Sequence, residues 1–214
     1  MMLLAFDLDG TLVRLPIDWR VVESNIERIS GGQVRSFLGF LARFYNTRKF
    51  WEIHQLVERL ELEAVERLEV LDNADVVVRD ASKHFEIAIV TMQSRYVCRA
   101  VLRKLGLESL VKYVVARDDA GTRVDQLRQL ISIAGKPPRE IIFVGDKVLD
   151  AFSALMLGIN PILVLRTVSN PWFTPSDNIL EDLEAMQIPV VNSLREALDL
   201  ALRLGRQRSV EGEE

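Results

Sequence analysis

Residues 3–12, Leu-Leu-Ala-Phe-Asp-Leu-Asp-Gly-Thr-Leu, are the stretch from which the fold of this chain is best interpreted. Leu3–Phe6 is a short and continuously apolar run, which is typical of a strand covered on both faces of a sheet. The apolar run ends at Asp7. Asp9 and Gly10 follow, and glycine permits a tight turn. The stretch therefore predicts a buried strand that ends in a pair of carboxylates.

Further apolar runs follow along the chain, separated by amphipathic stretches. The runs are Ile87–Val90, Val111–Val115, Ile141–Val144, Ile162–Leu165 and Pro189–Val191. Their length and β-branched content predict strands, and the stretches between them have helical spacing. Strands that alternate with helices on this scale predict a doubly wound, Rossmann-like α/β fold, with a parallel sheet and helices on both faces.

The interval between the first two predicted strands is roughly three times longer than a crossover helix needs. It carries three helical faces, Trp19–Ile29, Val34–Tyr45 and Ile53–Leu71, separated by Gly31-Gly32 and Asn46-Thr47. We therefore expect a small helical domain inserted after the first strand. The predicted organisation is an α/β core at 1–15 and 74–205, a helical insertion at 16–73, and a flexible tail at 206–214.

Composition and charge exclude several classes of protein. Of the 214 residues, 49% are hydrophobic, which is too many for a disordered chain. The single cysteine, Cys98, excludes a disulfide scaffold, and one cysteine with two histidines cannot form a metal–thiolate site. The formal charge of −4 argues against a surface that binds nucleic acid. We expect a cytoplasmic protein, because we recognise neither a signal peptide nor a membrane span.

Polar side chains follow the ends of several predicted strands. Asp7 and Asp9 follow the first strand, Thr91 the second, and Asp146 the fourth, with Asp150 one helical turn further on. In an open parallel sheet these strand ends meet at one edge, where ligands bind. So many neighbouring carboxylates are costly without a cation, and carboxylate oxygens favour a hard cation such as Mg²⁺. The sequence therefore predicts a magnesium site at this edge.

The spacing within the first loop suggests two chemical roles. Asp7 and Asp9 lie two residues apart in an extended chain, so both leave the same side of the backbone. One can act as a nucleophile while the other exchanges protons with a leaving group. The amides of this loop, and the helix N-terminus after Thr91, can face a phosphate.

Taken in this order, the motifs resemble those of the haloacid dehalogenase-like superfamily of phosphohydrolases. Phe6–Leu12 is similar to its first motif, Ile89–Thr91 to its second, and Phe143–Asp150 to its fourth. The predicted helical insertion stands where this superfamily carries a helical cap, which indicates the branch of phosphoglycolate phosphatases and phosphomutases. The resemblance covers most of the chain.

The resemblance implies a magnesium-dependent phosphatase that acts on a small phosphorylated metabolite. Asp7 would attack phosphorus and become an aspartyl-phosphate, while Asp9 would protonate the leaving oxygen and then activate water. Mg²⁺ would be held by Asp7, by the backbone carbonyl of Asp9 and by Asp146. Asp150 belongs to the same metal group and would orient the site. The residues expected to bind substrate are Gly10, Thr11, Thr91, Met92, Arg123 and Lys147.

The third motif departs from the superfamily pattern, which carries a Lys there. The corresponding stretch is Ala120–Asp125, and Arg123 stands where the Lys would align. Arg keeps the charge of Lys but not its geometry. Lys147, next to Asp146, is the competing source of a cation. We expect Arg123 to take the role of the missing Lys.

Alternatives to a phosphatase stay open. A phosphomutase would keep all of these residues, and a non-catalytic phosphate-binding module is compatible with the missing Lys. A dehalogenase would need no magnesium and lacks the second carboxylate of the first motif, so Asp9 argues against it. We expect a monomer or homodimer that binds neither nucleic acid nor membranes.

Three further features of the sequence, outside the motifs, give expectations about structure. His54 is expected to be a partly exposed helix residue rather than a base. Trp172-Phe173, in a Pro-rich loop, is a candidate contact surface. The insertion is expected to close over the site on hinges near residues 14–16 and 72–75.

Overall fold

The computed structural model describes residues 1–34, 36–166 and 177–211, and its core is a six-stranded parallel sheet. The strand order is β5-β4-β1-β6-β7-β8. The strands are β1 (Leu3–Phe6), β4 (Glu86–Val90), β5 (Val111–Val115), β6 (Ile141–Gly145), β7 (Asn160–Val164) and β8 (Val190–Val191). Because β1 lies between β4 and β6, the residues that follow it occupy the middle of the carboxyl edge of the sheet.

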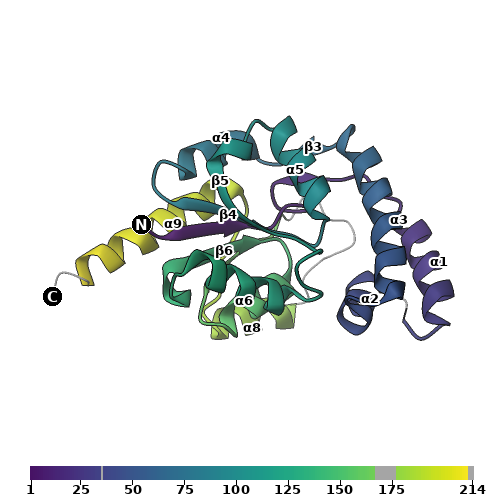
Figure 1. Ribbon diagram of the computed structural model, residues 1–214. Helices are drawn as coiled ribbons and strands as arrows, with labels where there is room; N and C mark the ends of the chain where they lie inside the picture. The colour runs from purple at the N-terminus through teal and green to yellow at the C-terminus, as the bar shows by residue number, and fades with distance from the viewer. Residues whose placement is uncertain (35, 167–176, 212–214) are drawn as a thin grey trace.

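Helices cover both faces of this sheet, as Figure 1 shows. One face carries α4 (Ala74–Ala81), α5 (Arg95–Lys104) and α9 (Leu194–Glu211), and the other carries α6 (Arg123–Ala134), α7 (Val148–Leu155) and α8 (Asp177–Ala185). Two short 3₁₀ helices, Glu108–Leu110 and Pro138–Glu140, precede β5 and β6. Alternate side chains of β1 enter the two apolar layers, Leu4 and Phe6 one layer, Leu3 and Ala5 the other. The predicted doubly wound α/β fold is confirmed.

The insertion after β1 consists of three helices with an apolar core of their own. They are α1 (Trp19–Ser30), α2 (Phe37–Phe44) and α3 (Arg48–Val65), here called the cap helices. Their shared core contains Val22, Ile26, Phe40, Ile53 and Val57. Figure 1 shows the cap helices beside the sheet domain, at the carboxyl end of the strands. The short antiparallel strands β2 (Val13–Arg14) and β3 (Glu69–Val70) connect the two parts.

The end of the insertion differs from the sequence-based prediction. The apolar pattern predicts a third helical face as far as Leu71, but α3 ends at Val65. Leu68 packs against the core of the α/β domain instead, and the amide of Leu71 donates to the carbonyl of Leu12 at 3.0 Å. These apolar residues therefore belong to the junction with the core, where the returning chain pairs with the outgoing one.

Part of the segment that is predicted to be a flexible tail, 206–214, belongs to the last helix. Helix α9 continues to Glu211, so residues 206–211 are helical. Arg, Gln and Glu have high helix propensity, which explains why a polar segment prolongs the helix. Trp172 and Phe173 lie outside the residues that the structure describes. Within the described ranges, no helix is both long and apolar enough to cross a membrane.

Candidate active site

The loop that follows β1 forms the centre of the candidate site. The amide of Asp7 donates to the carbonyl of Val144 at 2.9 Å, which continues the pairing of β1 and β6 by one residue. Gly10 has a positive φ of 91°, and a Cβ at this position would collide with the Asp146 carboxylate. Only glycine therefore allows this loop to approach Asp146 so closely.

Three of the four predicted metal residues meet at this point. Asp7, Asp146 and Asp150 each offer a carboxylate oxygen, and these oxygens all lie within 4.8 Å of one another. The Thr11 hydroxyl donates to Asp146 Oδ1 at 3.5 Å. The side chain of Asp9 lies apart from this group, because its Oδ1 accepts from the amide of Leu15 at 2.8 Å.

Arg123 and Lys147 both lie at this carboxylate group, but in different ways. Arg123 begins α6 and is only 5% exposed, with Nη2 at 2.8 Å from Asp7 Oδ1 and Nε at 2.8 Å from Asp150 Oδ1. The Lys147 side chain is 52% exposed, and its Nζ lies 3.2 Å from Asp146 Oδ1. The structure thus buries Arg123 against the predicted nucleophile and places Lys147 at the rim.

The loop after β4 carries Thr91 and Met92, which are both predicted to bind substrate. Thr91 is buried, and its hydroxyl forms a hydrogen bond with the side chain of Gln93. Gln126 Nε2 donates to the Thr91 carbonyl at 2.7 Å, which anchors the loop to α6. The Met92 carbonyl accepts from Arg117 Nη1 at 2.7 Å. Helix α5, capped by Ser94, begins directly after this loop.

Burial and charge shift the pKa values of this group. Loss of hydration raises the pKa of Asp7 to about 7, although Arg123 opposes the shift. Burial likewise raises the pKa of Asp9 to about 6, against the hydrogen bond from Leu15. Burial alone would lower the pKa of Lys147, but the carboxylates around it, Asp146 foremost, raise it well above its usual value.

This charge balance is what a divalent cation requires. The three carboxylates of Asp7, Asp146 and Asp150 meet two cationic side chains, Arg123 and Lys147, so one negative charge stays uncompensated when all three carboxyl groups are ionised. The donors are carboxylate oxygens, which are the ligands that Mg²⁺ prefers. The residues present therefore fit a magnesium ion.

Arg166, two residues after the end of β7, is a structural residue of this site that the sequence motifs do not identify. Its Nη1 and Nη2 donate to the carbonyls of Gly10 and Thr11 at 2.7 and 2.9 Å. Its Nε donates to Asp72 Oδ2 at 3.0 Å. Arg166 thus joins the loop after Asp9 to the point where the chain returns from the cap helices.

The cap helices contact the loop that leads from β5 to Arg123. The Tyr45 hydroxyl donates to the carbonyl of Asp118 at 2.9 Å. A Cβ on Gly121 would lie only 2.6 Å from the Cβ of Tyr45, so a glycine is needed for this approach. The insertion therefore packs at the carboxyl edge of the sheet, next to the carboxylate group.

His54 of α3 is buried in this contact, so the prediction of a partly exposed residue is wrong. Its Nε2 lies 3.7 Å from both Glu58 Oε2 and Asp118 Oδ1. By their types and spacing these three side chains resemble the ligands of a metal site. However, Arg117 Nε donates to His54 Nδ1 at 3.3 Å, so the ring proton resides on Nε2. Burial and Arg117 lower the pKa of His54, which keeps it neutral. A protonated Nε2 has no lone pair for a metal ion.

Fold and site together define an α/β protein with a carboxylate-rich site at the carboxyl edge of its sheet. The family model of haloacid dehalogenase-like hydrolases matches residues 18–164. The chain belongs to this family, and it is accordingly a hydrolase. The resemblance expected from its sequence motifs is confirmed.

Individual proteins of known name and solved structures are similar to this chain. The phosphoglycolate phosphatase of Synechococcus elongatus is 24% identical over 177 residues, which span 77% of this chain and 84% of that protein. A haloacid dehalogenase-like hydrolase from Streptococcus pneumoniae has a TM-score of 0.64 at 16% identity, covering 94% of this chain and 98% of its own. For the L-2-haloacid dehalogenase of Xanthobacter autotrophicus the TM-score is 0.59 at 16% identity, with the same coverage. Such structural likeness shows a shared fold, which phosphatases and dehalogenases have in common.

Proposed function

We propose that this hydrolase is a magnesium-dependent phosphatase that cleaves a small phosphomonoester through an aspartyl-phosphate intermediate. The observation that carries the proposal is the contact between Asp7 and Arg123 inside a group of three carboxylates. It combines a nucleophile, ligands for a hard cation and a buried positive charge for phosphoryl oxygens. The similarity to a phosphoglycolate phosphatase supports the same class of substrate.

In the proposed reaction a carboxylate oxygen of Asp7 forms a bond to phosphorus while the bond to the ester oxygen breaks. Asp9 gives its proton to the departing oxygen and then takes a proton from the water that hydrolyses the aspartyl-phosphate. Gly10, Thr11, Thr91 and Met92 supply the loops that surround the phosphoryl group. Mg²⁺, held by Asp7, Asp146 and the backbone carbonyl of Asp9, supplies charge neutralisation for the phosphoryl oxygens when bound.

Arg123 supplies the second positive charge in this proposal. Its contact with Asp7 supports this role, because phosphoryl oxygens that approach the nucleophile would lie next to the guanidinium. Asp150 holds Arg123 through Nε, and its other oxygen accepts from the amide of Lys147 at 3.3 Å. We therefore give Asp150 an orienting role within the metal group rather than direct coordination.

The insertion is proposed to act as a cap on the α/β core. Residues 16–73 would close over residues 1–15 and 74–205, with the paired strands β2 and β3 next to the hinges. The positive φ angles of Asp72 and Asn73, 48° and 53°, mark a sharp change of direction at the second hinge. A closed cap excludes water that would compete for the phosphoryl group.

Hydrolysis of a chromogenic aryl phosphate, with and without magnesium, tests the proposed function. We expect release of inorganic phosphate in the presence of Mg²⁺ and a loss of at least about 10²-fold when a chelator removes it, because uncompensated carboxylates then repel the phosphate dianion. A panel of phosphorylated metabolites, with phosphoglycolate first, would then define the substrate. Hydrolysis that is insensitive to chelation would contradict the magnesium requirement, and release of halide from a 2-haloacid instead of phosphate would contradict the proposed class.

Different pH profiles for two kinds of substrate are expected from the raised pKa of Asp9. The carboxyl group must be protonated to serve as an acid, so its contribution is present below its pKa of about 6 and is lost as the pH rises through that value. For an alkyl phosphate, a poor leaving group, the kcat profile should be bell-shaped, because Asp7 must lose its proton, with a pKa of about 7, while Asp9 must keep its own. On the alkaline side kcat should fall about tenfold per pH unit above about pH 7. An aryl phosphate needs less protonation and should show a shallower decline.

Replacing Asp9 with Asn provides the control for this assignment. Asp9→Asn should remove the difference in pH dependence between the two substrates and slow alkyl phosphate cleavage by about 10²-fold or more. The measurement is kcat for both substrates as a function of pH. If the alkyl and aryl profiles of the unaltered protein coincide, Asp9 is not the acid.

A further inference from the structure

Arg117 is fully buried between the cap helices and the α/β core. It follows β5, and no part of its side chain or of the Glu61 side chain is exposed. Its Nη1 and Nη2 contact the two carboxylate oxygens of Glu61 at 2.8 and 2.9 Å. Nε donates to His54, and the guanidinium carbon lies 5.4 Å from the ring centroid of Phe37. One core side chain therefore reaches both α2 and α3.

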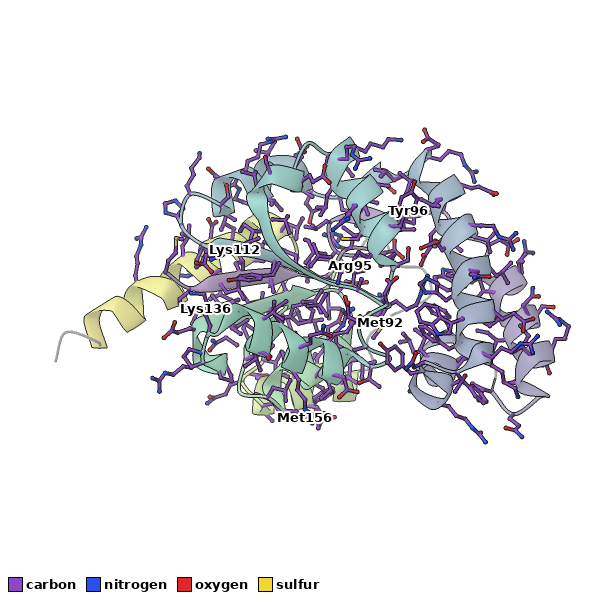
Figure 2. The ribbon with its side chains drawn as sticks, viewed as in Figure 1. Met92, Arg95, Tyr96, Lys112, Lys136 and Met156 are labelled. Carbon is purple, nitrogen blue, oxygen red and sulfur yellow. The ribbon has the colours of Figure 1, made fainter. Side chains whose placement is uncertain are left out.

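The same guanidinium also holds the loop that carries Thr91. Arg117 Nη1, which contacts Glu61, donates as well to the carbonyl of Met92 at 2.7 Å. The amide of Ser94, at the other end of this loop, lies 3.5 Å from Glu61 Oε2. Figure 2 shows Met92 at the end of the sheet domain that faces the cap helices. The ion pair thus links the Thr91 loop to α3, in addition to the bonds that the loop receives from Gln126 and from the backbone amide of Arg117.

A buried ion pair such as Arg117–Glu61 fixes the orientation of its side chains more than it stabilises the fold. The cost of removing both charges from water offsets most of their attraction, so an apolar pair of similar size is often as stable. A bidentate contact between arginine and a carboxylate nevertheless fixes distance and angle closely. If the cap moved away, as proposed above, both charges would regain water, which would make the contact reversible.

We propose that Arg117 is a positioning residue that couples docking of the cap helices to the position of the Thr91–Ser94 loop. The inference rests on the proposed phosphatase function, in which Thr91 contacts the phosphoryl group. When the cap docks, Glu61 orients the guanidinium, and the guanidinium holds the Met92 carbonyl next to Thr91. Substrate binding at the loop and docking of the cap then favour each other.

The double variant Arg117→Met/Glu61→Met separates positioning from stability. The apolar pair leaves no unpaired buried charge, so we expect thermal stability near that of the unaltered protein. Turnover should still fall, because the Met92 carbonyl loses its hydrogen bond from Arg117. We expect kcat/KM to fall by about 10²-fold, the scale for a misplaced reacting group. The inhibition constant for inorganic phosphate should rise in parallel. Arg28→Met/Glu52→Met removes an exposed ion pair between α1 and α3 and should change neither quantity.

Two results would overturn the inference. One is a folded double variant with unaltered kcat/KM and unaltered phosphate inhibition, which would make the ion pair purely structural. If the double variant does not fold, Arg117→Lys decides, since it keeps the charge but loses the two parallel contacts with Glu61 that orient the guanidinium. Restored activity in Arg117→Lys would also overturn the inference. These results can be distinguished from a failure of the proposed function. In that case the unaltered protein itself would hydrolyse no phosphomonoester.

Discussion

Asp7→Asn is expected to reduce phosphatase turnover by about 10⁴-fold or more, the scale for losing a nucleophile. The amide has nearly the shape of the carboxylate but cannot form an acyl phosphate that turns over. Arg123 would keep its contact with Asp150, so the site should retain its architecture. The measurement is kcat at saturating magnesium, together with a thermal melt that confirms the fold.

Asp199→Asn is a suitable control for this variant, because Asp199 is an exposed carboxylate on α9, away from the site. It should hydrolyse phosphomonoesters at the unaltered rate. Near-normal turnover of Asp7→Asn under magnesium saturation would show that another group attacks phosphorus, and the mechanism proposed above would be wrong.

The second large effect is expected for Arg123→Met, which should lower kcat/KM by at least about 10²-fold. The guanidinium is buried, and its contacts with Asp7 and Asp150 hold it against the proposed nucleophile. Methionine fills much of the same volume, and Asp150 would lose its partner. Arg123→Lys should recover part of the activity, since a lysine restores the charge that the family's third motif carries.

Lys147→Met tests the competing assignment with a matched substitution. Lys147 is half-exposed and contacts Asp146 rather than Asp7, so its loss should cost much less than the loss of Arg123. Comparing kcat/KM for the two variants on one substrate ranks the two cations. The reverse order would assign the phosphate-binding charge to Lys147 and leave Arg123 as the partner of Asp150.

Much of the fold is predictable from the sequence, because its signals are local. Leu3–Phe6 and Val111–Val115 are predicted with the bounds that the structure has, since a short apolar run between polar residues is a strong strand signal. The meeting of Asp7, Asp146 and Asp150 also follows, because the carboxyl ends of parallel strands share one edge. Local pattern and sheet topology therefore account for the carboxylate group.

Contacts between distant segments leave no comparable signal. Arg117 and Glu61 are 56 positions apart, and neither belongs to a motif, so their pairing depends on how the cap helices dock. Arg166 binds backbone carbonyls, which any sequence provides. The burial of His54 and the end of α3 at Val65 likewise depend on the junction between cap and core. Leu68 fits the apolar spacing of α3, so the pattern predicts a longer helix. In the structure Leu68 is apolar because it packs on the core.

Chemical trapping of the reacting carboxylate can identify the nucleophile. The unaltered protein would be quenched during turnover of a phosphomonoester, the acyl phosphate reduced with borohydride, and the modified residue located by peptide mass spectrometry. We expect reduction at Asp7 that depends on substrate, and none in Asp7→Asn. Reduction at a different residue, or rapid turnover with no modification of Asp7, would contradict the proposed mechanism.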